Sequence, residues 1–345
     1  MKRKKYIDLV KRSNFLAYSR LNKVRLDKNE KIDKFSKEFF KNLKHKLNSD
    51  LLTAYPEVYP LVLNIAKKYN IKKKNILVTS GIDSALKTII EGYTNKKDLV
   101  AILEPTFAMT NIYCKLANLK IIKIKYDNNL NLDLKKLFKN INKNLRLVIL
   151  SNPNSPTGTI IDKKDIKKIL EKTKKFNIPV IIDEAYYGFT KQTAINLISK
   201  YKNLFVTRTF SKMFGLAGLR VGFIASNSKN IEYISKLKPM YETNSVAIEA
   251  AKILLKKSSL VKKYVDGINF TKSKLITALE KNNLSYFKTY ANFMLINFKS
   301  KKKRILQYAS KNNILISKNL PFKNYIRITL GPYNYFKGII KIINN

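Results

Sequence analysis

Between about residues 76 and 225 the chain alternates short β-branched apolar runs with longer amphipathic stretches rich in lysine. Most of the apolar runs are separated by segments long enough to form a helix. This alternation is typical of an open α/β sheet with mostly parallel strands and helices on both faces. The pattern therefore predicts a seven-stranded sheet from the runs 76–80, 99–104, 120–126, 146–151, 178–183, 203–209 and 219–226.

The two ends of the chain have a different pattern. An amphipathic segment spans 33–47, and residues 240–345 carry helical patterns with further strand candidates at 293–298 and 325–331. No internal repeat and no linker rich in Gly, Ser or Pro divides the chain. We expect 51–235 to form a large domain that carries the ligand site, and 236–345 to form a smaller α+β domain that the N-terminal segment 1–50 joins.

The charge of the chain is strongly basic, with 69 Lys and Arg against 23 Asp and Glu and a formal net charge of +46. Clustered basic residues would indicate binding to nucleic acid or to an anionic surface. The lysines are instead dispersed among Asn and Ile, as in 67–76 and 136–145. Dispersed lysines favour a solvated surface over a dedicated nucleic-acid face, so no specific nucleic-acid partner is predicted.

Two residue types that often carry enzyme chemistry are nearly missing. Cys114 is the only cysteine and His45 the only histidine, which excludes disulfide frameworks, Cys/His zinc sites and histidine-dependent nucleophilic catalysis. Proton transfer must then use lysine, tyrosine, a carboxylate or a cofactor. The basic N-terminus lacks an apolar segment, and no run of about eighteen apolar residues occurs, so we expect a soluble, cytoplasmic protein without a membrane partner.

Ligands of open parallel sheets bind at the carboxyl ends of the strands, so the residues after each run are candidates for chemistry. Residues Ser80–Ser84 follow the first run and start a helical pattern, which makes either an anion site or an ordinary helix cap. The polar turn 152–158 follows the fourth run and either aims Asn and Ser side chains at a ligand or is simply a tight loop.

Two charged residues follow later runs. Asp183 ends the run 178–183, where a buried carboxylate requires a cation such as a protonated pyridine nitrogen; the alternative is a cap for a following helix, and no metal site is expected. Lys212 follows the run 203–209 within a glycine-rich loop, where it can lose its proton and attack an aldehyde. Ser211 and Arg220 are placed to hold a phosphate.

The order of these motifs is more specific than any one of them. The segments SGIDSA, EPTFAM, NPNSPTG, DEAYYGF and TFSKMFGLAGLRVGF together resemble the fold-type I aminotransferases, and most closely the histidinol-phosphate aminotransferase group. The similarity covers residues 26–331. It implies the PLP-transferase fold type I, pyridoxal 5'-phosphate (PLP) as cofactor, and transfer of an amino group from a donor, with glutamate as a candidate, to a keto or aldehyde acceptor.

The resemblance implies a role for each matching residue. Lys212 would hold PLP as a Schiff base and later move the substrate proton, while Asp183 would keep the pyridine nitrogen protonated. Tyr186 would bond the cofactor's O3′. The other cofactor contacts implied are a ring-stacking aromatic at Phe107, a contact to O3′ at Ser155, and a phosphate cup made by the backbone amides of Ile82 and Asp83 with the side chains of Ser211 and Arg220.

Other matches concern the substrate and the partner subunit. Tyr55 would reach the cofactor phosphate and substrate site of a neighbouring subunit, which implies a homodimer with shared active sites. Arg327 would bind the anionic end of the substrate; the less favoured alternative is a surface arginine on an edge strand. Asn29 lies in 26–30, which matches a segment that folds over the substrate.

Three departures from the family pattern bear on specificity. Ser155 replaces a usual asparagine, Ser317 stands where histidinol-phosphate enzymes tend to carry an arginine, and Lys31 with Ile32 replaces a usual aromatic. A PLP-dependent decarboxylase of the same fold is the alternative within the family, because similar active sites can break the bond from the α-carbon to either the carboxylate or the hydrogen. A basic nucleic-acid-binding protein on an enzyme scaffold is the alternative from another class.

Overall fold

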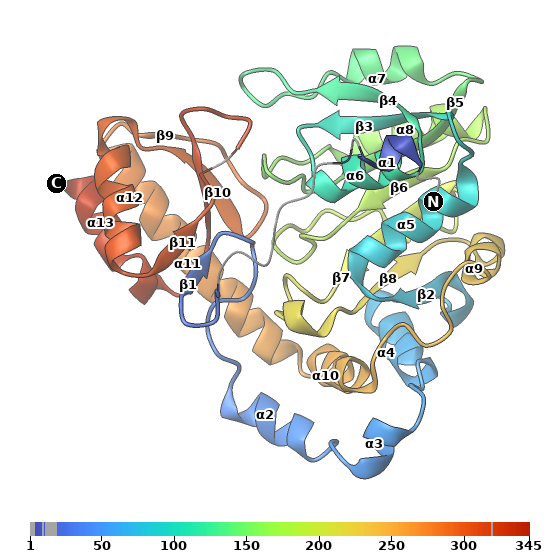
Figure 1. Cartoon of the computed structure of the whole chain (residues 1–345), viewed down its shortest axis with the longest axis horizontal. Coiled ribbons are helices and arrows are strands. Elements are labelled where there is room, and N and C mark those ends of the chain that lie inside the picture. Colours follow the sequence, from blue (N-terminus) through green and yellow to red (C-terminus); the bar gives the residue numbers. More distant parts are fainter. Residues whose placement is uncertain (1–3, 9, 11–18, 319) are drawn as a thin grey trace.

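The computed structural model describes residues 4–8, 10, 19–318 and 320–345. Its centre is a seven-stranded sheet in the order β2-β8-β7-β6-β5-β3-β4 (Figure 1). Only β8 runs antiparallel to its neighbours, β7 and β2. Every predicted run of the block forms a strand: β2 Ile76–Thr79, β3 Leu99–Glu104, β4 Lys120–Lys125, β5 Leu145–Ser151, β6 Val180–Asp183, β7 Leu204–Thr209 and β8 Gly222–Ala225.

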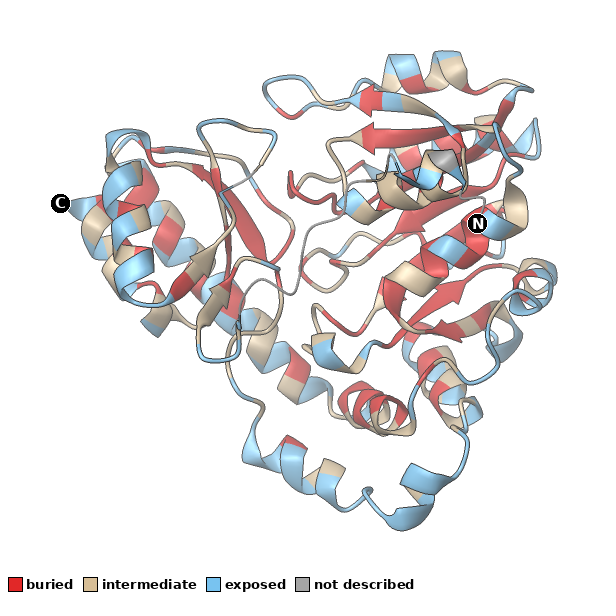
Figure 2. Ribbon diagram, viewed as in Figure 1, coloured by how far each residue is buried: buried red, intermediate tan, exposed pale blue. Residues whose placement is uncertain are grey.

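Helices cover both faces of this sheet. One face packs against α4 (Tyr59–Tyr69), α7 (Leu134–Asn140), α8 (Lys163–Lys174) and α10 (Ser245–Lys256). The other packs against α5 (Gly81–Tyr93), α6 (Ala108–Leu116) and α9 (Ser228–Ser235). The inner strands β3, β5, β6, β7 and β8 are mostly buried (Figure 2), which explains why they appear in the sequence as continuous apolar runs. The edge strand β4 is largely exposed.

A second core lies beside the large one. Its antiparallel sheet has the order β12-β10-β9, formed by Ile326–Thr329, Phe293–Asn297 and Ser285–Tyr286. The first strand of the chain, β1 (Val24–Leu26), pairs in parallel with β11 (Ile314–Ile316), so the two ends of the chain meet here. The helices of this part are α11 (Ser258–Lys281), α12 (Lys302–Lys311) and α13 (Lys337–Asn344).

Residues 37–53, which form α2 and α3, are largely exposed. Helices α2 (Lys37–Lys44) and α3 (Ser49–Thr53) follow β1 and reach along the large domain, where Phe39 is buried in the large core (Figure 2). Helix α10 also packs in that core, although it follows the predicted boundary at residue 236. The domain boundaries stay a prediction.

The remaining helices are short. They are α1 (Lys5–Asp8) and the 3₁₀ turns η1 Lys73–Asn75, η2 Ile195–Leu197, η3 Ala217–Leu219, η4 Lys299–Lys301 and η5 Tyr333–Tyr335. Among the residues that the structure describes, no helix has the length and apolar character needed to cross a membrane. The cytoplasmic location stays a prediction.

Candidate active site

The carboxyl ends of β5, β6 and β7 and the first turn of α5 surround one cavity. Nine of the predicted site residues line it, from segments far apart in the sequence. They are Ile82, Asp83, Phe107, Ser155, Asp183, Tyr186, Ser211, Lys212 and Arg220. The topology of a parallel sheet explains this convergence, because consecutive strands present their carboxyl ends at the same edge.

The start of α5 and the side chain of Arg220 form one wall of the cavity. Arg220 places its Nη2 3.1 Å from Oδ2 of Asp83 and donates from Nη1 to Ser211 Oγ at 3.2 Å. Gly81 has φ +76°, and a Cβ there would meet Arg220 Nη2 at 2.8 Å. The side chain of Ser80, the N-cap of α5, makes no hydrogen bond to the first turn of the helix. Free helix amides, a hydroxyl and a guanidinium at one place fit a phosphate.

Asp183 lies buried at the end of β6, with 3% of its surface exposed. It accepts hydrogen bonds from Ala185 N at 3.0 Å and Thr207 Oγ1 at 3.5 Å. Burial raises the pKa of Asp183 to about 7, because the ionised carboxylate is poorly solvated there. The alternative of a helix cap is wrong, since the residues that follow form turns and the next helical segment begins at Ile195. A cation at this carboxylate would fit the site.

Lys212 and Tyr186 both contact the N-terminal segment. The Nζ of Lys212 donates to the carbonyl oxygen of Lys28 at 3.0 Å and lies 5.7 Å from the centre of the Tyr186 ring. Tyr186 is buried and packs edge-on against Phe293 of the small domain. The cavity is therefore bounded by the large domain, by the segment around Lys28 and by a tyrosine that contacts the small core.

Three predicted residues do not line the cavity. Asn29 is buried behind Tyr186 and donates to its hydroxyl at 2.8 Å. Arg327 donates to the carbonyl oxygen of Asp27 at 2.5 Å, and burial lowers its pKa. Within the described residues, its buried Nε has no hydrogen-bond partner. Tyr55 is 74% exposed and stacks on Tyr241 at 4.2 Å, so a single chain does not bring it to the cavity.

The turn 152–158 works differently from what its sequence suggested. Asn154 donates to the carbonyl oxygen of Pro105 at 2.9 Å and accepts from Thr106 Oγ1 at 2.9 Å, so it ties two loops together instead of facing a ligand. Ser155 alone of these polar side chains lines the cavity. The interpretation that its asparagines aim at a ligand is wrong, because the buried turn uses them for its own hydrogen bonds.

Sequence reasoning missed other residues at this site. Thr209 lines the cavity, accepts from the backbone N–H of Ser211 at 3.0 Å and donates to its Oγ at 3.0 Å, which orients that hydroxyl. Its place in the segment TFSK, directly after a strand, was the available signal. Glu242 accepts from the backbone N–H of Ser80 at 3.0 Å and from Ser84 Oγ at 2.7 Å, which fixes the start of α5. No local signal pointed to Glu242.

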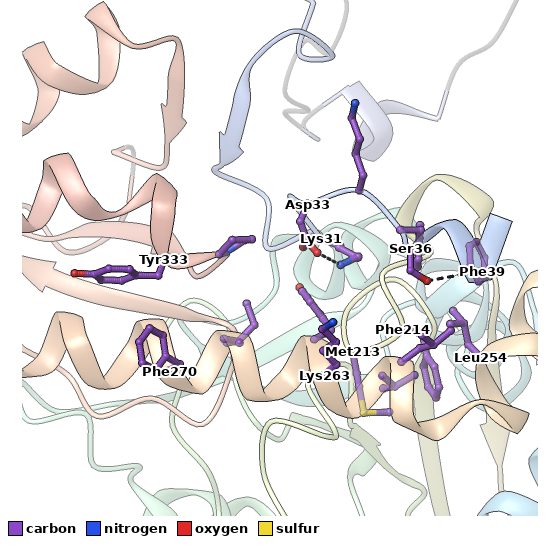
Figure 3. Close-up of a pocket in the computed structure, with 18 residues that line it drawn as sticks. Lys31, Asp33, Ser36, Phe39, Met213, Phe214, Leu254, Lys263, Phe270 and Tyr333 are labelled. Carbon is purple, nitrogen blue, oxygen red and sulfur yellow. Dashed lines mark hydrogen bonds and ion pairs between the residues drawn. The ribbon is translucent and has the colours of Figure 1, made fainter.

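A separate cavity of about 460 Å³ lies under the N-terminal segment (Figure 3). Lys31 points toward Asp33, with which it forms an ion pair, and Met213, the residue after Lys212, faces the same space. A Cβ on Gly215 would meet Lys31 Cδ at 2.5 Å, so the lysine stem lies directly on the glycine-rich loop. The cavity thus shows how closely the segment after β1 is seated against the loop that carries Lys212.

Comparison with known proteins agrees with this geometry. The chain belongs to the family of class I and II aminotransferases, whose model matches residues 22–336. It is 33% identical to the histidinol-phosphate aminotransferase of Clostridium novyi (strain NT) over 318 residues, which cover 90% of this chain and 87% of that protein.

Solved structures share the fold. The histidinol-phosphate aminotransferase of Clostridium acetobutylicum has a TM-score of 0.83 at 22% identity, over 93% of this chain and 98% of that one. The Sinorhizobium meliloti enzyme of the same name, in complex with pyridoxal-5'-phosphate, has a TM-score of 0.82 at 19% identity, over 93% and 89%. These findings confirm the predicted fold class and the predicted enzyme class, an aminotransferase that works with PLP.

Proposed function

We propose that this aminotransferase acts on histidinol phosphate or a related small anionic amine, with the cavity around Lys212 as its active site. One observation carries the assignment of the site: an amine, a buried carboxylate and an anion cup converge on a single cavity. PLP requires these same three groups, for its aldehyde, its pyridine nitrogen and its phosphate. The name of the Clostridium novyi relative supports the choice of substrate.

The residues of the cavity fit the cofactor group by group. The amides of Ile82 and Asp83, with Ser211 and Arg220, would hold the phosphate. Asp183 would hold the pyridine nitrogen in its protonated form, which in turn satisfies a carboxylate whose burial is otherwise costly. When bound, the cofactor supplies an electron sink for the charge that develops on the substrate carbon. The remaining cofactor contacts proposed are Phe107 on the ring, and Tyr186 and Ser155 at O3′.

The chain's own contribution to the chemistry centres on Lys212. Its amine can both attach the aldehyde and carry a proton to and from the substrate carbon. The carbonyl of Lys28 already accepts its Nζ hydrogen. We assign to residues 26–30 the task of covering the amine and limiting water near it, since Lys28 and Glu30 line the cavity from that side.

Arg327 is the proposed anchor for an anionic group of the substrate. Its guanidinium has a buried Nε without a partner in the described part of the chain, and a buried unsatisfied donor favours an anionic acceptor. Ser317, which pairs with Arg327 through backbone bonds of 3.2 and 3.0 Å, brings no charge to this place. The decarboxylase alternative uses the same anchor, so the reaction itself must be assayed.

Substrate and anchor can be tested together. Histidinol phosphate should convert the visible absorbance band of the bound cofactor to that of the amino form. Arg327→Ala should raise KM about 10- to 100-fold, the range for losing one charge-assisted hydrogen bond. Arg146→Ala, an exposed arginine on β5, is the control. An unchanged KM in Arg327→Ala would remove this residue from the site. Release of carbon dioxide from an amino acid substrate without a keto acceptor would favour the decarboxylase.

We also propose that the enzyme is a homodimer with shared active sites. Leu52 and Met240 are 71% and 74% exposed, and the stack of Tyr55 on Tyr241 joins the segments that carry them. Large apolar side chains gathered at one exposed place are typical of a protein interface. A partner on this surface would cover Tyr55, the residue whose family match contacts the neighbouring active site.

The proposed homodimer can be tested separately through its mass in solution. Sedimentation equilibrium should give twice the mass of the chain, and Leu52→Lys or Met240→Lys should shift the mass toward the monomer, because each places a charge in an apolar contact. Leu21→Lys is the matched control, since Leu21 is also a highly exposed leucine, at 83%, outside the proposed surface. A wild-type monomer at micromolar concentration would be incompatible with shared sites.

A further inference from the structure

Asn29 is fixed to the small domain by its backbone. It lies between β1 and α2, is 2% exposed, and has a left-handed φ of +57°, a conformation that asparagine tolerates. Its N–H donates to Thr329 Oγ1 on β12 at 2.9 Å, and its carbonyl accepts from Asn292 Nδ2 at 3.2 Å. The position of its side chain is therefore set by the small domain.

The hydrogen bonds of Asn29 assign the direction of its amide. Because Thr329 Oγ1 accepts the backbone N–H of Asn29, its own proton is directed to Asn29 Oδ1, 3.0 Å away. The amide nitrogen then faces Tyr186 Oη at 2.8 Å. The reverse orientation would leave the buried Thr329 hydroxyl proton without an acceptor among the described residues, which is costly.

This direction fixes what the Tyr186 hydroxyl can do. An amide N–H only donates, so the hydroxyl oxygen is the acceptor in this pair and its own proton must be directed elsewhere. Tyr186 lines the cavity together with Lys212 and Asp183. Its proton is thus available to an acceptor in the cavity, and accepting a bond from Asn29 makes the hydroxyl a stronger donor.

The other side of the same segment is held by the large domain. Two residues after Asn29, the stem of Lys31 lies on Gly215 of the large domain. Its amine pairs with Asp33 of the same segment and lies 4.2 Å from the centre of the Tyr264 ring on α11, in the small domain. Figure 3 shows Lys31 directed toward Asp33 beside Met213. With contacts to both domains within three residues, the segment has little freedom to turn Asn29 away from Tyr186.

We propose that Asn29 is a positioning residue, held by the small domain, that directs the Tyr186 proton to the phenolate oxygen of the cofactor. This role differs from direct contact with the substrate, which the sequence suggested for Asn29. The inference rests on the proposed cofactor site. If Asn29 has this role, the hydrogen bond at the cofactor depends on contact between the two domains. Thr329, which orients the Asn29 amide, belongs to the small domain, and Tyr186 belongs to the large one.

The test is a pH titration of the visible absorbance band of the PLP-loaded enzyme. A donor to the phenolate oxygen lowers the pH midpoint of this band, because it stabilises the oxygen after the neighbouring nitrogen has lost its proton. Tyr186→Phe should raise the midpoint by about one unit. Asn29→Asp, which is nearly isosteric and only accepts, should draw the tyrosine proton to itself and raise the midpoint to a similar extent.

Further variants separate this role from a purely structural one. Asn29→Gly keeps the left-handed backbone accessible and should raise the midpoint by about half as much, with no effect in the Tyr186→Phe background. Thr329→Val should also raise the midpoint, because it removes the hydroxyl that orients the Asn29 amide. Asn282→Ala, which removes an amide elsewhere in the small domain, should leave the midpoint unchanged. Thermal unfolding of each variant, followed by circular dichroism, confirms that it is folded.

Failure of the proposed cofactor site and failure of the inference about Asn29 would give different results. A wild-type protein that takes up no PLP would overturn the proposed cofactor site and this inference with it. A PLP-loaded enzyme in which Tyr186→Phe shifts the midpoint while Asn29→Asp and Thr329→Val keep the wild-type value would overturn the inference alone. Equal shifts of Asn29→Gly in the wild-type and Tyr186→Phe backgrounds would do the same, since Asn29 would then act without the tyrosine.

Discussion

Lys212→Ala is expected to reduce turnover by about 10⁴-fold or more, since it removes both the covalent attachment point and the group that moves the proton. The variant should still take up PLP through the phosphate cup, because Arg220, Ser211 and the first turn of α5 are unchanged. Its absorbance should be that of the free aldehyde. Borohydride reduction followed by peptide mapping should place the cofactor mainly on Lys212 in the wild type, and the variant should keep only the weak labelling of surface amines.

The matched control is Lys191→Ala, an exposed lysine that follows the turn after β6. In a chain with so many lysines this control is needed, because a reactive aldehyde also labels surface amines. Turnover of the full substrate by Lys212→Ala near the wild-type rate, or reduction that labels a different lysine, would contradict the assignment. The labelling outcome can be read without knowing the natural substrate pair.

The sheet and most of the site were predictable from the sequence for a physical reason. Strands buried on both faces must be apolar along their whole length, so runs such as 99–104 and 146–151 mark β3 and β5 directly. Parallel strands then bring their carboxyl ends together. Asp183 and Lys212 could be placed in one cavity from their positions after two runs, before any distance was known.

Residues whose roles depend on long-range contacts could not be placed in this way. Asn29 and Tyr186 are 157 positions apart, and only the packing of the small domain brings their side chains together. Lys31 is one of many lysines in the sequence, yet its side chain is nearly buried. Asn154 was misjudged in the opposite direction. Its turn has a sequence typical of ligand binding, but its amide forms hydrogen bonds with Pro105 and Thr106 instead.

Asp183→Asn is expected to reduce turnover by about 10²- to 10³-fold, the range seen when one key electrostatic partner of a transition state is removed. An amide cannot keep the pyridine nitrogen protonated, so the cofactor becomes a weaker electron sink. Binding of PLP should suffer less, since the phosphate cup is intact. Steady-state kinetics with cofactor titrations separates the two effects, and a rate within a few-fold of the wild type would remove Asp183 from this role.

The same substitution should have a second effect on the cofactor-free protein. Burial raises the pKa of Asp183 from 3.8 to about 7, so the folded state holds this proton more tightly than the unfolded state. The free energy of unfolding therefore falls as pH rises from about 4 to about 7 and stays low above it.

Asp183→Asn has no such pH-dependent loss. The free energy of unfolding of the variant minus that of the wild type should therefore be larger at about pH 8 than at about pH 5. Urea unfolding at both pH values measures the difference, with the exposed Asp266→Asn as control. Parallel pH profiles for Asp183→Asn and the wild type would mean that the carboxylate is solvated, and that it lacks the low-dielectric surroundings in which a cation is held strongly.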